Sequence, residues 1–174
     1  IFRKKQRMIP NLRLLLGRFL VLLLAQVLIF NHVDLFGYCN PAFYLLFILV
    51  YRFNQDQFTF IFLSFLLGFG IDLLSQTAGA HTIASVTIAY LRPLIARFSF
   101  GINDDQPYAM YYGTRFSSRI LYLGLIIFIH QMLFFWVEYF SFTHMVSILS
   151  NTIVGSIFTF LLLLTTLNLI RKEA

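Results

Sequence analysis

The sequence predicts an all-α, polytopic membrane protein whose six transmembrane helices form one integral membrane domain over residues 1–174. Three observations support this prediction. The chain is 59% hydrophobic and only 11% charged, whereas soluble domains average about 25% charged residues. Its apolar residues form repeated long runs instead of one core pattern. Its thirteen Lys and Arg residues concentrate near the ends of those runs.

Six apolar segments can be marked along the chain, each bounded by polar or turn-forming residues. They cover about residues 14–36, 41–53, 58–75, 82–98, 119–140 and 143–170. Most of them reach the roughly 20 residues that a helix needs to cross ~30 Å of hydrocarbon. We therefore expect a membrane-spanning helix in each segment.

The second segment, residues 41–53, is too short to be assigned from hydropathy alone. About 13 residues rise only ~20 Å as an α-helix, so the segment could also be re-entrant or interfacial. Basic residues favour a crossing, because six crossings place every Lys and Arg at or near the cytoplasmic side, with Arg52 extending from the inner end of this segment. Without it, four of them move outside: Arg92, Arg97, Arg115 and Arg119. We expect both termini in the cytoplasm.

The loops predicted by this topology leave little room for chemistry in water. Those on the outer face, at about 34–40, 75–81 and 140–143, are short, and so exclude a soluble extracytoplasmic domain. The longer loop at 99–118 contains turn-forming residues and is predicted to be a solvated cytoplasmic connector. Cys39 is the one cysteine, which excludes an intramolecular disulfide.

Asp72 is the most informative polar residue within an apolar segment. Ser64, Gly68 and Asp72 follow at i, i+4 spacing, which puts two small residues and an acid on one helical face. An acid so close to lipid requires a partner, water or the headgroups. We weigh two interpretations equally: Asp72 orders the outer turn through His81 or through backbone N–H groups near Gly79, or it extends into the headgroups.

A second stripe of small and polar residues lies on the sixth segment. It consists of Ser147, Asn151, Gly155 and Thr159, each four positions after the one before. Such a stripe is typical of close helix packing, either within the bundle or with a foreign helix, and internal packing is favoured about two to one.

Polar residues elsewhere give no catalytic pattern. His130 and Gln131 lie in the middle of the fifth segment, where neutral hydrogen-bonding groups more often join helices than relay protons. Seven acidic residues in the whole chain limit acid–base chemistry. No metal-ligand spacing, nucleophile elbow or phosphate-binding loop can be written. The basic residues mark helix ends and not one phosphate-binding face, which argues against nucleic acid. We expect a protein that is not an enzyme and binds no metal or cofactor.

One stretch of about 24 residues resembles a known family. It joins the third and fourth segments and reads Gly68-x-x-x-Asp72, Gly79-Ala80-His81 and Ala89-Tyr90-Leu91. This pattern is similar to that of the rod shape-determining protein MreD family, and the length, the six segments and the basic ends extend the likeness loosely over the chain.

The resemblance implies a non-enzymatic subunit of the bacterial cell-elongation complex in the inner membrane. Such a subunit binds MreC and works beside MreB, the RodA glycosyltransferase and a class B penicillin-binding protein to maintain cell shape and position peptidoglycan synthesis. It also implies a fold similar to the S components of energy-coupling-factor vitamin transporters. The family supplies no catalytic residues, so Gly68, Asp72, Gly79, His81 and Tyr90 are motif positions only.

The alternative is an S component itself, which binds a vitamin. That function requires polar groups that converge on a pocket open to the outside, and an inner surface for the energising module. Arg92–Pro93 and Ala96–Arg97 are candidates for such a surface, whereas polar residues at the outer face are few.

Overall fold

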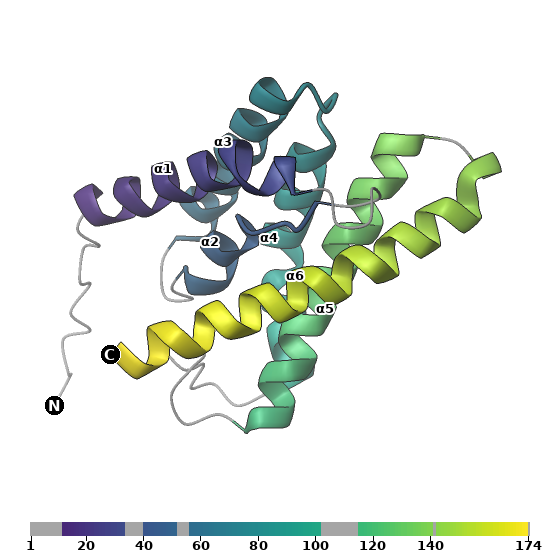
Figure 1. Cartoon of the computed structure of the whole chain (residues 1–174). Coiled ribbons are helices and arrows are strands. Elements are labelled where there is room, and N and C mark those ends of the chain that lie inside the picture. The colour runs from purple at the N-terminus through teal and green to yellow at the C-terminus, as the bar shows by residue number, and fades with distance from the viewer. Residues whose placement is uncertain (1–11, 34–39, 52–55, 102–114, 141, 174) are drawn as a thin grey trace, which may run out of the picture.

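The computed structural model describes residues 12–33, 40–51, 56–101, 115–140 and 142–173, and over these residues the chain forms helices and turns without any strand (Figure 1). This confirms the all-α prediction. The elements are α1 (Leu12–Leu28), the 3-10 helix η1 (Phe30–His32), α2 (Leu45–Val50), α3 (Gln57–Ser75), α4 (Ala80–Phe100), α5 (Phe116–Tyr139), the 3-10 helix η2 (Phe142–His144) and α6 (Met145–Glu173).

Five helical segments in the described part of the chain are long and apolar enough to cross a membrane. They are Leu14–His32, Gln57–Ser75, Ala80–Phe100, Phe116–Tyr139 and Met145–Ile170. Transmembrane helical character is thereby supported for five of the six predicted segments. The exception is the second, where among the described residues 41–51 only the six of α2 are α-helical.

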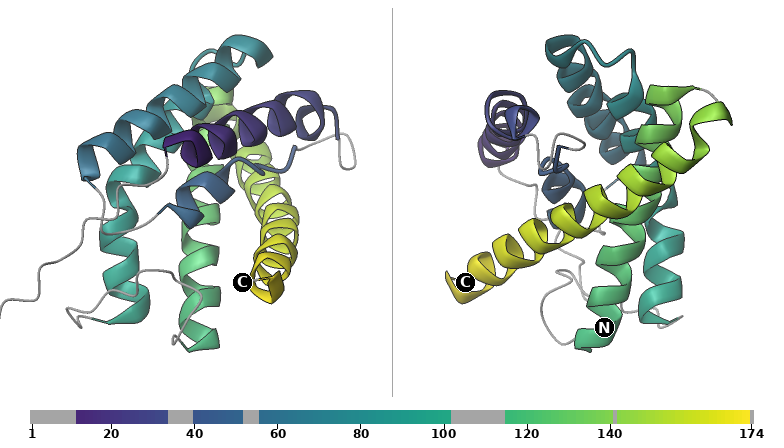
Figure 2. Two further views of the ribbon diagram at one scale, coloured as in Figure 1. Left: turned by 90° about the vertical axis from the view of Figure 1, so that its left-hand side faces the viewer. Right: turned by 45° about the vertical axis from the view of Figure 1, so that its right-hand side comes forward.

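Neighbours in sequence are mostly neighbours in space. α3 packs on α4, α4 on α5 and α5 on α6, while α1 packs mainly against α3. α6 runs obliquely across α5, and α2 lies between α1 and the α4–α5 pair (Figures 1 and 2).

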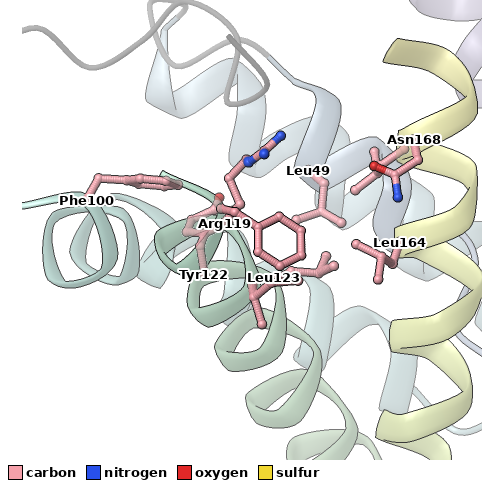
Figure 3. A pocket seen from close by; sticks show the side chains of 10 residues that line it. Leu49, Phe100, Arg119, Tyr122, Leu123, Leu164 and Asn168 are labelled. Carbon is pink, nitrogen blue, oxygen red and sulfur yellow. The ribbon is translucent and has the colours of Figure 1, made fainter. Parts of the chain in front are cut away.

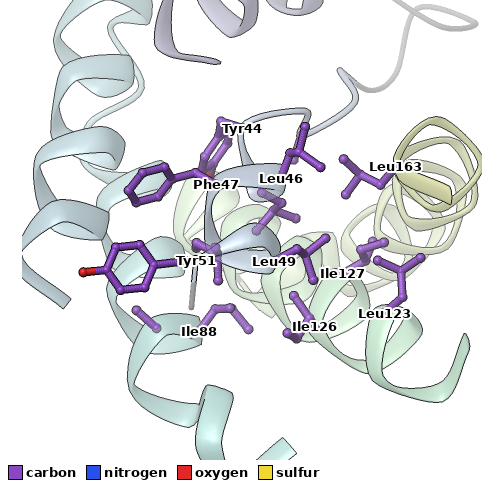
Figure 4. Close-up of a cluster of buried hydrophobic side chains, with 14 of the residues drawn as sticks. Tyr44, Leu46, Phe47, Leu49, Tyr51, Ile88, Leu123, Ile126, Ile127 and Leu163 are labelled. Atoms are coloured by element: carbon purple, nitrogen blue, oxygen red, sulfur yellow. The ribbon is translucent and has the colours of Figure 1, made fainter. Parts of the chain in front are cut away.

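The short helix α2 forms the centre of the bundle. Its apolar side chains are almost completely buried among α4, α5 and α6, as Figure 4 shows for Leu46, Leu49, Ile88, Ile126 and Leu163. Lipid tails are as apolar as these side chains, so close packing and dispersion, and not the exclusion of water, favour this arrangement.

The directions of the helices show how the chain passes through the bundle. Leu23 of α1 lies beside Gly70 of α3. Asn31 of η1, which follows α1, donates a hydrogen bond to Ser75 at the end of α3 at 2.5 Å. Both helices therefore run in the same direction, and the chain between them has to return from the end marked by Ser75, hereafter the Ser75 end. Residues 40–51 make this return inside the bundle, because Tyr51 stacks on Phe60 near the start of α3 at 4.6 Å between ring centroids.

Side chains compensate for interruptions in the helices. Pro93 lies inside α4 and has no N–H to donate to the carbonyl of Ala89. The Gln57 side chain donates to that carbonyl instead, at 3.1 Å. Within a bilayer such a freed carbonyl has no water to bind, so this contact keeps α4 intact.

Candidate functional site

A polar cavity of about 550 Å³ lies at the Ser75 end of the bundle. Its wall comes from α1, η1, the start of segment 40–51, the α3–α4 turn and α5. Amide side chains are its most frequent polar lining, contributed by Gln26, Asn31, Asn40, Gln76 and Gln131.

The α3–α4 turn on one side of the cavity is organised by the carboxylate of Asp72. Its Oδ1 atom accepts the backbone N–H of His81 at 3.0 Å and the hydroxyl of Thr77 at 2.5 Å. Its Oδ2 atom accepts the backbone N–H of Thr82 at 2.8 Å and the Thr82 hydroxyl at 2.5 Å. Asp72 thus caps the first turn of α4, where N–H groups lack helical partners and negative charge is favoured.

The two helices of this hairpin approach each other at Gly68. A Cβ atom there would lie 2.7 Å from the Cα atom of Thr82 and 2.8 Å from the carbonyl oxygen of His81. Gly79 begins α4 with φ of 90°, a left-handed conformation that glycine adopts without steric cost. Both glycines of the motif therefore have a backbone reason to be glycine.

The hydroxyl of Tyr44 contacts two histidines that line the cavity, His81 and His130. This hydroxyl lies 2.6 Å from Nε2 of His130, 3.3 Å from Nδ1 of His81 and 3.4 Å from the hydroxyl of Ser85. A phenol has one proton, and the short distance to His130 is typical of an O–H donor. We assign the Tyr44 proton to that contact, so the Tyr44 oxygen accepts from the other two groups.

The extended part of segment 40–51 is held by side chains from distant helices. The amide of Gln26 donates to the carbonyl of Pro41 at 3.1 Å and accepts the N–H of Tyr44 at 3.2 Å. Thr159 accepts the N–H of Ala42 at 3.1 Å. Non-helical backbone at membrane depth is tolerated only where protein or water satisfies it, and these contacts do so.

Arg92 holds the other end of this segment. Its guanidinium donates to the carbonyl of Leu49 at 3.3 Å, to that of Tyr51, and to the hydroxyl of Tyr122 at 3.1 Å. These carbonyls lie at the C-terminus of α2, where acceptors lack helical partners and a cation is favoured. Arg92 is 2% exposed, so it is not part of the inner surface that an S component requires, whereas Arg97 is exposed.

A second pocket lies toward the end of the bundle where α4 ends and α5 begins. Figure 3 shows Arg119 of α5 and Asn168 of α6 at its edge, with Leu49 and Leu164 between them. Its volume is about 40 Å³, which accommodates little more than a water molecule. This pocket is too small to be a ligand site.

The candidate residues of α3 and α4 that the sequence predicted do not all lie at one site. Ser64, Gly68 and Asp72 share one buried face of α3, and His81 is buried beside them. Asp72 accepts a hydrogen bond from the backbone N–H of His81 and not from its ring. The His81 ring stacks on Phe134, with 4.5 Å between the ring centroids. Tyr90 is 70% exposed on the outside of α4 and belongs to no site in the described structure.

The stripe on α6 packs mainly inside the bundle. Asn151 donates to the hydroxyl of Tyr139 at 2.9 Å. Gly155 faces Gln131, whose amide donates to Thr159 at 3.0 Å. Ser147 is exposed.

Sequence reasoning missed Tyr44, Gln26 and Arg92 as organisers of the interior. Tyr44 resembles any aromatic residue of an apolar run, and its partners are 37 and 86 residues away. Gln26 was the available signal, because a lone amide within a transmembrane segment requires partners. The predicted roles of Arg52, Cys39 and most of the 99–118 loop fall outside the described residues.

No group of three or more potential metal ligands occurs among the described residues. Comparisons with protein families, curated proteins and solved structures give no match for this chain.

Proposed function

We propose that this chain is a non-enzymatic, MreD-like membrane subunit of the bacterial cell-elongation complex, and that it binds an MreC-like protein. One observation carries the proposal. Four of the five motif positions, Gly68, Asp72, Gly79 and His81, lie together in the α3–α4 hairpin and act on its backbone. The stretch that resembles the family is thus a structural device, as a scaffold subunit requires.

The chemistry of Asp72 supports this interpretation over an enzymatic one. Both carboxylate oxygens already accept two hydrogen bonds each from the turn that they cap. A carboxylate used in this way is poorly placed to act as an acid or a base toward a substrate.

The proposed topology has six crossings with both termini in the cytoplasm. The second crossing is residues 40–51, which pass through the protein interior and not along lipid. Basic residues support the orientation: Arg97, Arg115 and Arg119 lie toward the end opposite Ser75, where a cytoplasmic location favours positive charge.

Recovery of partners from the native membrane tests this function. The tagged chain should recover an MreC-like protein, together with MreB, RodA and a class B penicillin-binding protein. Photo-crosslinking groups at exposed α6 positions, such as Leu149, Ile153 and Ile157, should then give adducts at helical periodicity. Buried Leu163 serves as the matched control. Adducts confined to the 99–118 loop, or no MreC-like protein, contradict the proposal.

The polar cavity favours a second candidate, the substrate-binding S component of a vitamin transporter. Its size lies within the roughly 300–1,000 Å³ of ligand pockets. The same purification distinguishes the two functions, because an S component should recover paired ATPases and no MreC-like protein.

A further inference from the structure

Two residues that line the cavity at the Ser75 end each contain a buried polar atom without a hydrogen-bond partner within the described residues. With Tyr44 donating to Nε2 of His130, the ring proton of His130 resides on Nδ1. That atom is buried and has no hydrogen-bond partner within the described residues. Asn40, another lining residue, has a buried Oδ1 atom that finds no partner in the described part of the chain. Unpaired buried polar groups are uncommon in native proteins and require an explanation.

The charge of the wall restricts which kind of molecule the cavity could bind. Among the described lining residues there is no Lys or Arg, and Glu138 is the one carboxylate. An anionic ligand would find no opposite charge and would be repelled by Glu138. Amides and hydroxyls instead both donate and accept, as do the hydroxyl and amide groups of neutral molecules.

We propose that this cavity binds an uncharged small molecule that carries hydroxyl or amide groups and is about the size of a nucleoside. Asn31, Asn40 and Gln76 have side chains that are partly or fully exposed at the wall and supply hydrogen bonds, and Phe134 supplies an apolar ring. The inference does not rest on the proposed function, because it uses only the geometry of the cavity and not the identity of a partner.

Equilibrium binding to the full chain in lipid nanodiscs tests this inference with two matched probe pairs. Adenosine is compared with adenosine 5′-monophosphate, and glucose with glucose 6-phosphate, so the members of each pair differ only by a phosphate. At least one uncharged probe should bind saturably, and at least about tenfold more tightly than its phosphate, which corresponds to about 1.4 kcal/mol.

Three variants connect binding to the cavity. Val27→Phe places a larger side chain in the wall and should weaken binding at least about tenfold. Leu24→Phe, on the exposed face of the same helix, should leave binding unchanged. Glu138→Gln removes the one carboxylate among the described lining residues and should narrow the difference in affinity between the uncharged probe and its phosphate.

Several results would overturn the inference. They are no saturable binding of either uncharged probe to protein with normal helical circular dichroism, equal binding of the phosphates, and undiminished binding to Val27→Phe. Because Val27 belongs to the peripheral helix α1, normal circular dichroism of this variant separates loss of the site from loss of the fold.

Discussion

Asp72 shows how a single acid in an apolar helix can be structural. Its carboxylate receives two backbone N–H groups from α4 and two hydroxyls, and is only 7% exposed. The capped helix start is thereby fixed against α3. Disturbing this residue should therefore affect the hairpin and everything that docks on it.

Substitutions at Asp72 should separate hydrogen bonding from charge. Asp72→Leu leaves the N–H groups of His81 and Thr82 without acceptors, at a cost of about 1–3 kcal/mol each. Asp72→Asn keeps one acceptor and should lose less. Thermal unfolding in detergent should therefore rank parent, Asn and Leu in decreasing order, and recovery of the MreC-like partner should follow that order at equal membrane abundance. Equal loss in both variants would instead indicate a role for the charge itself.

Gly68 allows a matched test of close helix approach. In Gly68→Ala the new methyl group meets backbone atoms of His81 and Thr82, and overpacking of this kind costs about 1–3 kcal/mol. Gly124→Ala, with open space around the added atom, should stabilise by about 0.5–1 kcal/mol through helix propensity. Opposite shifts in unfolding temperature are expected, and equal shifts would show that the hairpin adapts freely.

Some of the residues that organise the hairpin could be predicted from local sequence spacing, and others could not. Gly68 and Asp72 could be predicted because small residues on one helical face are typical of close packing, and an acid near lipid requires a partner. Tyr44 could not be found, because its contacts with His81 and His130 depend on the fold and not on any local spacing.

Among the elements, α2 depends most on the rest of the molecule. Six residues are too few for a stable isolated helix, and Arg92 supplies donors for its terminal carbonyls. The five long helices could be predicted because length and hydropathy alone determine them. The conformation of residues 41–51 could not, because it depends on hydrogen bonds from Gln26, Thr159 and Arg92 of other helices.

Loss of Arg92 should release α2 while the long helices remain. Arg92→Leu leaves the carbonyls of Leu49 and Tyr51 unpaired, at about 1–3 kcal/mol each. With Cys39 replaced by Ser, a cysteine introduced at buried Ile48 should react with maleimide markedly faster in this variant. Arg97→Leu, at an exposed position of the same helix, should leave the rate unchanged. Unchanged reactivity in Arg92→Leu would show that packing alone holds α2.

Over the whole molecule, the relative direction of α1 and α3 restricts the possible membrane topology. α1 and α3 run in the same direction, as the contacts Leu23–Gly70 and Asn31–Ser75 require. If both cross the bilayer, the chain between them must cross as well, and residues 40–51 make that crossing within protein. The six crossings predicted from the basic residues require the same crossing between α1 and α3.

Accessibility in intact cells tests this crossing directly. In a chain with Cys39 replaced by Ser, Ala78→Cys in the α3–α4 turn should react with a membrane-impermeant maleimide added outside. Arg115→Cys, at the start of α5, and a tag before residue 1 should become accessible only after the membrane is permeabilised, because positive charge is retained in the cytoplasm. An accessible N-terminal tag beside a protected residue 115 would mean that residues 40–51 do not cross. If residue 78 is protected and residue 115 reacts, the protein has the opposite orientation in the membrane, with the polar cavity on the cytoplasmic side.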